Sequence, residues 1–195
     1  MFKKLLTYDT ELLIFLNNLG SSYQDTFWYY ITKIWFWVPL YIFFIFMIIK
    51  RYTKQEALRI LYTFLSLLAV TLSLTYYVKV YVLRSRPVNN KEIFESLRIM
   101  IQPIDYSFFS GHACNSFAIT TFFYLFMRRK MKNAWVFYLW PILFSYSRLY
   151  FAVHFPSDVL VGALVGIATA ITSYNLYKKF SPKITRDDLE VESDS

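Results

Sequence analysis

The sequence has few of the charged residues that a water-soluble domain requires. Asp, Glu, Lys and Arg make up 17% of its 195 positions, against roughly 25% in typical soluble domains. Hydrophobic residues account for 56% and aromatic residues for 22%, so the charges are too few to coat a globule. Only four glycines are present, which argues against a β-rich barrel with many tight turns. The composition predicts an all-α fold, a polytopic membrane helix bundle.

Cysteine is almost absent as well. Cys114 is the only one, which excludes an internal disulfide and a cysteine-based metal cluster, and we interpret it as a packing residue. The net charge of +8 could indicate nucleic-acid binding or the basic flanks of membrane spans. The basic residues flank apolar stretches and are divided between their two ends, so we expect a lipid bilayer and no nucleic acid as the partner.

Stretches without Asp, Glu, Lys or Arg mark about five candidate transmembrane helices. A hydrocarbon core of ~30 Å requires about 20 helical residues, so the first and fourth stretches are short and need interfacial residues at their ends. Tryptophans and tyrosines lie near these ends, as in an aromatic belt. The five stretches are Ile34 to Ile49, Ile60 to Val78, Ser107 to Met127, Asn133 to Ser147 and Val159 to Tyr177.

The two ends of the chain differ from the spans. Residues 1–22 carry a stripe of leucines interrupted by Asp9 and Glu11, which predicts a retained, interfacial amphipathic helix and no cleavable signal. Residues 181–195 are acidic and nearly without apolar side chains, which predicts a disordered cytoplasmic tail. Residues 1–180 then form a single membrane-embedded domain.

The basic residues also predict the orientation of the spans. Five spans place twelve Lys and Arg on one side and nine on the other, and the positive-inside rule makes the richer side cytoplasmic. The loop 87–106 and the loop around His154 then face outward. We expect a bacterial inner membrane, with any site at these loops facing the periplasm or the outside.

The first candidate motif on the outer side is Lys79-x6-Arg86-Pro87. On a helix, Lys79 and Arg86 would share a face, and Pro87 would end the helix soon after. Two such cations suit a phosphate group, because an arginine fork matches its oxygens and a lysine adds a point charge. The alternative is a snorkelling pair that anchors the span in the membrane.

The second candidate motif is Ser110-Gly111-His112, at the start of the third span. Gly111 lets the backbone approach a ligand, and the free N–H groups of a helix start attract an anion. A histidine there could donate a proton to a leaving oxygen. The alternative is a Ser110 N-cap followed by an interfacial histidine.

The third candidate motif is Ser147-Arg148-x5-His154-x3-Asp158. A local helical turn could let the Asp158 carboxylate hold one nitrogen of His154 and leave the other free as a nucleophile. The alternative is that Asp158 caps a helix and His154 is interfacial. Both histidines of the chain, an aspartate and three cations gather on the outer side, and such a set suits in-line displacement at a phosphoryl group.

These three motifs, in this order and spacing, resemble the signature motifs of the type-2 phosphatidic acid phosphatase superfamily. The resemblance covers the catalytic core, residues 79–158. It implies that His154 attacks phosphorus to give a phosphohistidine, that Asp158 orients His154, and that His112 protonates the leaving oxygen. It also implies that no metal or other cofactor is required. The phosphate-binding residues would be Lys79, Arg86, Ser110, Gly111 and Arg148.

One departure from the superfamily is visible, since Phe109 stands where the second motif usually begins with proline. The resemblance implies a lipid phosphatase that acts on a phosphate monoester or diphosphate of a membrane lipid. Its compact plan is similar to undecaprenyl diphosphate phosphatases, with lipid A phosphatases second and phosphatidylglycerophosphate or phosphatidate phosphatases third. A different class of function is a non-enzymatic phospholipid binder or transporter. The sequence indicates no oligomeric state.

Overall fold

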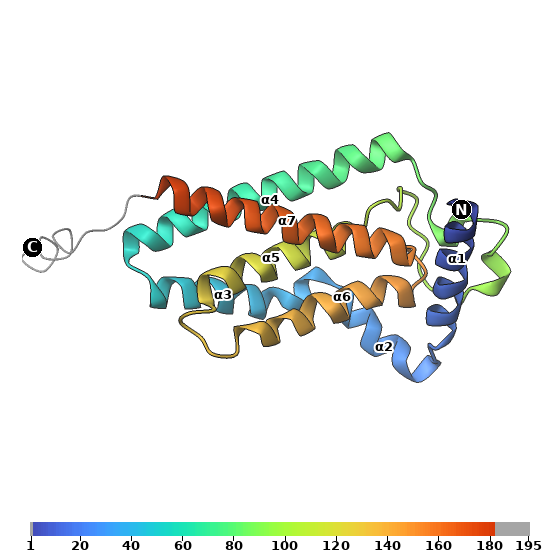
Figure 1. Cartoon of the computed structure of the whole chain (residues 1–195). Coiled ribbons are helices and arrows are strands. Elements are labelled where there is room, and N and C mark those ends of the chain that lie inside the picture. Colours follow the sequence, from blue (N-terminus) through green and yellow to red (C-terminus); the bar gives the residue numbers. More distant parts are fainter. Residues whose placement is uncertain (1, 182–195) are drawn as a thin grey trace, which may run out of the picture.

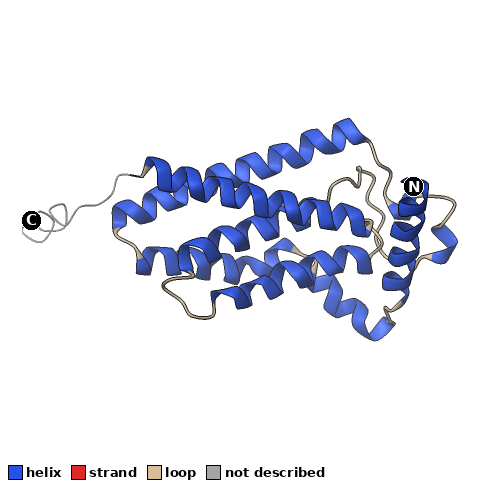
Figure 2. Ribbon diagram, viewed as in Figure 1, coloured by secondary structure: helices blue, strands red, loops and turns tan. Residues whose placement is uncertain are grey.

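The computed structural model describes residues 2–181, and in this range every regular element is helical (Figures 1 and 2). Four short 3₁₀ turns, at Ile34–Trp37, Pro87–Asn89, Phe94–Ser96 and Ala134–Tyr138, accompany the α-helices. The predicted acidic tail lies outside the described residues except for Ser181. The α-helices are α1 (Phe2–Asn18), α2 (Ser22–Ile31), α3 (Val38–Arg51), α4 (Lys54–Val82), α5 (Gly111–Met127), α6 (Leu139–Tyr150) and α7 (Pro156–Phe180).

Helices α3 to α7 run along the long axis of the molecule (Figure 1). Three segments are long and apolar enough to cross a membrane, namely Ile34–Arg51, Lys54–Asn89 and Pro156–Phe180. Helix α5 has 17 residues and α6 has 12, which is short for a lone span. The prediction of an all-helical membrane protein is confirmed, whereas the count of five spans stays a prediction.

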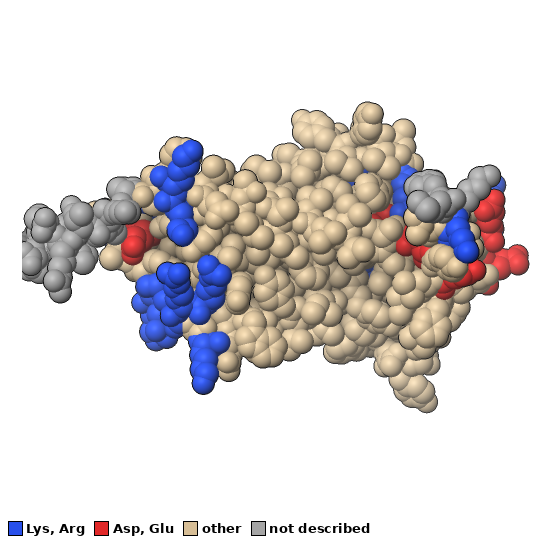
Figure 3. All heavy atoms as spheres, in the orientation of Figure 1, with Lys and Arg blue, Asp and Glu red and all other residues tan. Residues whose placement is uncertain are grey.

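The distribution of charge agrees with a membrane-embedded bundle. Figure 3 shows Lys and Arg gathered at one end of the molecule, a broad band without charge, and acidic and basic residues at the other end. The basic end is formed by the last turns of α3 and α7 and the start of α4. Large hydrophobic side chains such as Ile42, Leu65 and Leu164 are exposed along the band, as lipid-facing residues would be.

Helices α5 and α7 approach each other closely because α7 carries two glycines at the contact. A Cβ at Gly162 would lie 2.5 Å from the carbonyl oxygen of Ser110, and one at Gly166 would lie 2.1 Å from that of Cys114. Any larger side chain would force the backbones apart. This contact places the start of α5 directly beside the start of α7.

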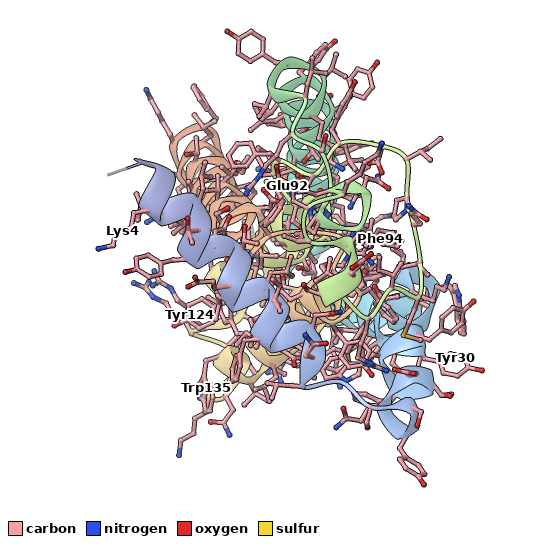
Figure 4. The ribbon with its side chains drawn as sticks, turned by 90° about the vertical axis from the view of Figure 1, so that its right-hand side faces the viewer. Lys4, Tyr30, Glu92, Phe94, Tyr124 and Trp135 are labelled. Carbon is pink, nitrogen blue, oxygen red and sulfur yellow. The ribbon has the colours of Figure 1, made fainter. Side chains whose placement is uncertain are left out.

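Helix α1 lies across the end of the bundle opposite the basic end (Figure 1). Figure 4 looks onto this end and shows α1 in front of the other helices, beside the loop that carries Glu92 and Phe94. Leu13 and Asn17 are fully buried, and the Asn17 side chain bonds to the backbone of Arg98 and Tyr150. The helix itself agrees with the expected amphipathic segment, and its place in the membrane interface stays a prediction. Helix α2, which follows it, was not expected from the sequence.

Candidate active site

The first motif does not lie on one helix, which corrects the expectation for Lys79 and Arg86. Helix α4 ends at Val82, and Leu83 closes it in the left-handed conformation, with φ 54°. Arg86 then has extended backbone, φ −71° and ψ 151°, because a residue before proline is disfavoured in the helical region. Lys79 therefore belongs to the helix and Arg86 to the loop that leaves it.

A carboxylate brings these two cations together instead. The Lys79 Nζ donates to Asp105 Oδ2 at 2.9 Å. The Arg86 Nη2 donates to both Asp105 carboxylate oxygens at 2.8 and 2.9 Å, and Nε donates to Oδ1 at 3.0 Å. Although burial would raise the pKa of Asp105, the hydrogen bond from Lys79 and the charge of Arg86 outweigh it and lower that pKa. Asp105 stays ionised and spans the two cations.

The remaining terminal nitrogen of Arg86 meets His154. The Arg86 Nη1 donates to the carbonyl oxygen of Val153 at 2.7 Å and lies 3.2 Å from His154 Nε2. A guanidinium has only donors, so Nε2 must be the acceptor, and the proton of the neutral ring is on Nδ1. The lone pair of Nε2 therefore points toward Arg86, which together with Lys79 forms the cation cluster of the site.

Asp158 lies on the other side of the His154 ring. Its Oδ2 is 3.6 Å from His154 Nδ1, longer than a hydrogen bond, and Nδ1 is buried without another partner. The same Oδ2 accepts from the backbone N–H of Phe155 at 2.9 Å, so Asp158 also caps α7, as the alternative interpretation held. Catalytic hydrogen bonds are often long without substrate and tighten when it binds.

Burial and charge keep His154 neutral. Burial lowers the pKa of His154 well below its usual value, and the charges of Arg86, Arg148 and Lys79 lower it further. A neutral imidazole with an unprotonated Nε2 is the form that can act as a nucleophile. The cations that would attract an anionic group therefore also keep the nitrogen available.

The second motif opens α5 and is joined to the third by the backbone. Ser110 is the N-cap, with its hydroxyl accepting from the Ala113 N–H at 3.4 Å, and its own N–H donates to the Asp158 carbonyl oxygen at 3.0 Å. The preceding Phe109 is buried, and its peptide bond to Phe108 is cis. Ser110 therefore both starts α5 and touches α7.

His112 lines an apolar cavity of about 530 Å³ together with Lys79 and Gly111. Its ring packs against that of Phe144, with centroids 4.8 Å apart. The rest of the lining comes mainly from apolar side chains of α3, α4, α5 and α6, including Leu68, Leu72, Ile119 and Trp140. Lys79 of the first motif and His112 of the second thus stand at an apolar cavity that can accept a hydrocarbon chain.

Arg148 is buried at the end of α6 and is held from α2. Its Nη1 donates to the hydroxyl of Thr32, the residue that ends α2, and its Nε has no partner. The Arg148 carbonyl oxygen also accepts from the Val153 N–H at 3.1 Å, which helps to fix the loop that carries His154. Helix α2, absent from the sequence interpretation, therefore supports a predicted phosphate-binding residue.

Three charged residues that the sequence did not assign to the site, Asp105, Arg84 and Asp9, also belong to it. Asp105 binds Lys79 and Arg86, while Arg84 joins Asp158 to Asp9 of helix α1. The sequence analysis interpreted Asp9 only as an interruption of the leucine stripe. One local signal for Asp9 exists, since Asp9, Leu13 and Asn17 recur every four residues and share one face of α1.

The sequence profile of the PAP2 superfamily matches residues 56–182, more than half of the chain and all three motifs. The chain belongs to the PAP2 superfamily. The lipid A 4'-phosphatases of Bacteroides thetaiotaomicron and Porphyromonas gingivalis are 27% and 29% identical to it, over 96% and 89% of this chain and 84% and 74% of their own lengths. An undecaprenyl-diphosphatase of Sulfolobus acidocaldarius is 28% identical over 84% of this chain and 70% of its own.

The crystal structure of LpxE from Aquifex aeolicus is similar in fold, with a TM-score of 0.61 and 27% identity. The match covers 85% of this chain and 93% of that one. The resemblance drawn from the three motifs is thereby confirmed. This PAP2 protein is an integral membrane lipid phosphatase, a hydrolase of phosphoric esters.

Proposed function

We propose that this PAP2 phosphatase hydrolyses the phosphate ester of a membrane lipid through a phosphohistidine at His154. The observation that carries the proposal is the position of His154 Nε2, 3.2 Å from Arg86 Nη1, with its lone pair directed at the cation cluster. Lys79 belongs to that cluster and also lines the apolar cavity. A phosphate held there would lie between the nucleophile and space for its hydrocarbon chain.

The proposed reaction has two displacements. The Nε2 lone pair of His154 attacks phosphorus while the ester P–O bond breaks, and His112 gives its proton to the departing lipid oxygen. Asp158 stabilises the positive charge that develops on the His154 ring. His112 then takes a proton from water, which attacks phosphorus and breaks the P–N bond. Inorganic phosphate leaves and both histidines are regenerated.

The same proposal assigns charge stabilisation to the phosphate-binding residues. Lys79, Arg86 and Arg148 would hold the oxygens, and the Ser110 hydroxyl and Gly111 N–H would assist at the start of α5. Helix dipoles and fixed cations in a site with little water stabilise a phosphoryl transition state strongly. The proposed chemistry uses these side chains alone, without a metal or cofactor.

For the substrate we propose a phosphate monoester of lipid A type. Two relatives matched over most of this chain are lipid A 4'-phosphatases, which favours this substrate over the one that the sequence resemblance put first. Undecaprenyl diphosphate is the second candidate, supported by the undecaprenyl-diphosphatase relative. Either lipid offers a chain for the apolar cavity and a phosphate for the cations.

We also propose that the site faces the periplasm from the bacterial inner membrane. The site lies at the end of the bundle opposite the strongly basic end (Figure 3). The basic end is expected in the cytoplasm by the positive-inside rule.

The test is phosphate release by the purified protein in detergent with a chelator present. The panel is lipid A, undecaprenyl diphosphate, phosphatidylglycerophosphate and phosphatidate, with His154→Gln and Lys91→Gln as variants. We expect release from lipid A, no release by His154→Gln, and wild-type release by Lys91→Gln, which removes an exposed cation of the outer loop. Bound lipid without release in the wild type would contradict the enzyme mechanism and favour a lipid binder or transporter.

A separate experiment tests the intermediate. A rapid-quench measurement should find lipid alcohol released in a burst of about one equivalent before phosphate appears, if the second step is the slower one. His112→Gln should slow both steps, and His154→Gln should give neither burst nor turnover. A His154→Gln enzyme that still forms a covalent phosphoenzyme would contradict the assignment of the nucleophile.

A further inference from the structure

Three charged side chains, Asp9, Arg84 and Asp158, form a line from helix α1 to His154. The Arg84 Nη1 donates to Asp158 Oδ1 at 2.6 Å, and Arg84 Nη2 donates to Asp9 Oδ2 at 2.8 Å. The Asp158 side chain is fully buried, and those of Asp9 and Arg84 are 10% and 21% exposed. One guanidinium therefore bridges two carboxylates, from α7 and from α1, in largely buried surroundings.

Ser157 also forms hydrogen bonds with both Asp9 and Arg84. Its backbone N–H donates to Asp9 Oδ1 at 2.8 Å, its hydroxyl donates to Asp9 Oδ2, and Arg84 Nη1 donates to its hydroxyl at 2.8 Å. Asp9 thus satisfies an N–H in the first turn of α7, the turn that carries Asp158. The turn that carries Asp158 is therefore bound to a residue of α1.

The charges in this line explain why two carboxylates are needed. Arg84 alone would neutralise Asp158 and remove much of the negative charge that His154 requires when it becomes cationic. With Asp9 on the other side of the guanidinium, the three groups together carry one negative charge. Arg84 can then hold Asp158 in place while the line as a whole stays anionic toward the ring.

We propose that Asp9 and Arg84 are positioning residues for the phosphatase site, which makes helix α1 part of the catalytic structure. Arg84 fixes the Asp158 carboxylate, and Asp9 restores the negative charge that Arg84 cancels. The inference rests on the proposed roles of His154 and Asp158.

The other groups that face His154 make this negative charge important. Arg86 from the loop after α4, Lys79 from α4 and Arg148 from α6 all act on His154 as positive charges, and His112 of α5 and His154 interact electrostatically. Asp105 is the other nearby carboxylate, and it is bound to Arg86 and Lys79. Asp158, with Asp9 behind it, is therefore the carboxylate on the Nδ1 side of the ring, and the Ser107 backbone also favours the protonated ring.

The test compares Asp9→Asn with Asp25→Asn in the full-length protein. Asp25 is a matched control because it also pairs with an arginine, Arg98, at 3.0 Å, and because its side-chain partners among the described residues, Arg98 and Tyr150, are not proposed site residues. We expect Asp9→Asn to lower kcat about tenfold with KM within about twofold, and Asp25→Asn to leave both unchanged. A positioning role changes the transition state more than ground-state binding.

The pH profile of kcat/KM separates positioning from simple loss of structure. One charge lost from this line should move the acid limb by a few tenths of a pH unit. Asp9→Asn should move it to lower pH, because a negative charge is lost. Arg84→Gln should move it to higher pH, because two carboxylates are left uncompensated. Arg84→Lys keeps the charge and should keep the limb, with lower kcat because a single ammonium replaces the fork.

Several results would overturn the inference. One is an Asp9→Asn enzyme that behaves like Asp25→Asn, and another is a lower kcat with an unmoved acid limb, since that indicates only a loosened α1. If Arg84→Gln does not fold, Asp9→Asn and Arg84→Lys still decide the question. A wild-type protein that releases no phosphate from any lipid would instead contradict the proposed function, so the two failures are distinguishable.

Discussion

Replacing Asp105 with asparagine should strengthen the binding of phosphate-like anions. The Asp105 carboxylate takes the Nε and Nη2 donors of Arg86 and the ammonium of Lys79, which are the groups proposed to hold the substrate phosphate. An incoming anion must displace this carboxylate or share its donors, and it is also repelled by its charge. Asparagine keeps the size of the side chain and removes both effects.

The size of the effect follows from the burial of the partners. A charge-assisted hydrogen bond contributes about 1.5–3 kcal/mol, whereas an exposed ion pair contributes about 0–1 kcal/mol. The Arg86 side chain is 5% exposed but that of Asp105 is 57% exposed, so an intermediate value of about 1.4 kcal/mol is appropriate. This corresponds to about a tenfold tighter inhibition constant.

The assay is inhibition of lipid phosphate release by vanadate and by inorganic phosphate. Both inhibition constants should fall about tenfold in Asp105→Asn, and neither should change in Glu95→Gln, which removes an exposed charge from the same loop. Because its cation partners lower the pKa of Asp105, the difference should persist across pH 5–8. Unchanged or weaker inhibition in Asp105→Asn would refute the reasoning and indicate that Asp105 holds the two cations in their binding positions.

Three other results are expected. Gly166→Ala should lower the free energy of unfolding by about 1–3 kcal/mol, since its Cβ would meet the Cys114 carbonyl oxygen at 2.1 Å. Thr172→Ala, on the exposed face of α7, should leave the free energy of unfolding unchanged. Equal melting temperatures of the two variants would contradict the close α5–α7 contact. Because the pKa of His154 is lowered in the fold, the unfolded chain binds a proton at higher pH than the folded protein does. The stability of the fold should therefore decrease as pH drops below about 6.5, and it should decrease less in His154→Gln. Thermal melts across pH 4.5–7.5 measure this dependence, and the opposite slope would mean that His154 is charged in the fold. Phosphate release should continue in excess EDTA, and a loss restored by a divalent cation would contradict the proposed chemistry.

The residues of the three motifs could be named from the sequence because their types and order carry the chemistry. Two histidines, an aspartate and three cations are residue types that suit a phosphoryl group once the fold brings them together. The local geometry was less accessible. Lys79 and Arg86 were expected on one helix face, but Pro87 forces Arg86 into extended backbone, and a carboxylate from loop 90–110 joins the two cations instead.

The contacts that complete the site could not be predicted because they join distant parts of the chain. Asp9 and Arg84 are separated by 75 positions, and Thr32 and Arg148 by 116. A periodic pattern reports which face of a helix is buried but not which residue it meets. Asp9 was therefore interpreted only as an interruption of the leucine stripe, although it is bound to another segment of the protein.

The placement of His154 in a short loop explains why so many segments contribute to this site. The backbone hydrogen bonds within the loop between α6 and α7 hold its main chain but do not fix the imidazole ring, so polar contacts from other segments must do so. Arg86 holds the Val153 carbonyl, and Asp158 closes the turn at the Phe155 N–H. These two residues are in turn held by Asp105 and Arg84. Substitutions of Asp105, Arg84 or Asp9 should therefore alter anion binding or turnover, whereas substitutions of apolar side chains along the cavity should act mainly on the lipid chain.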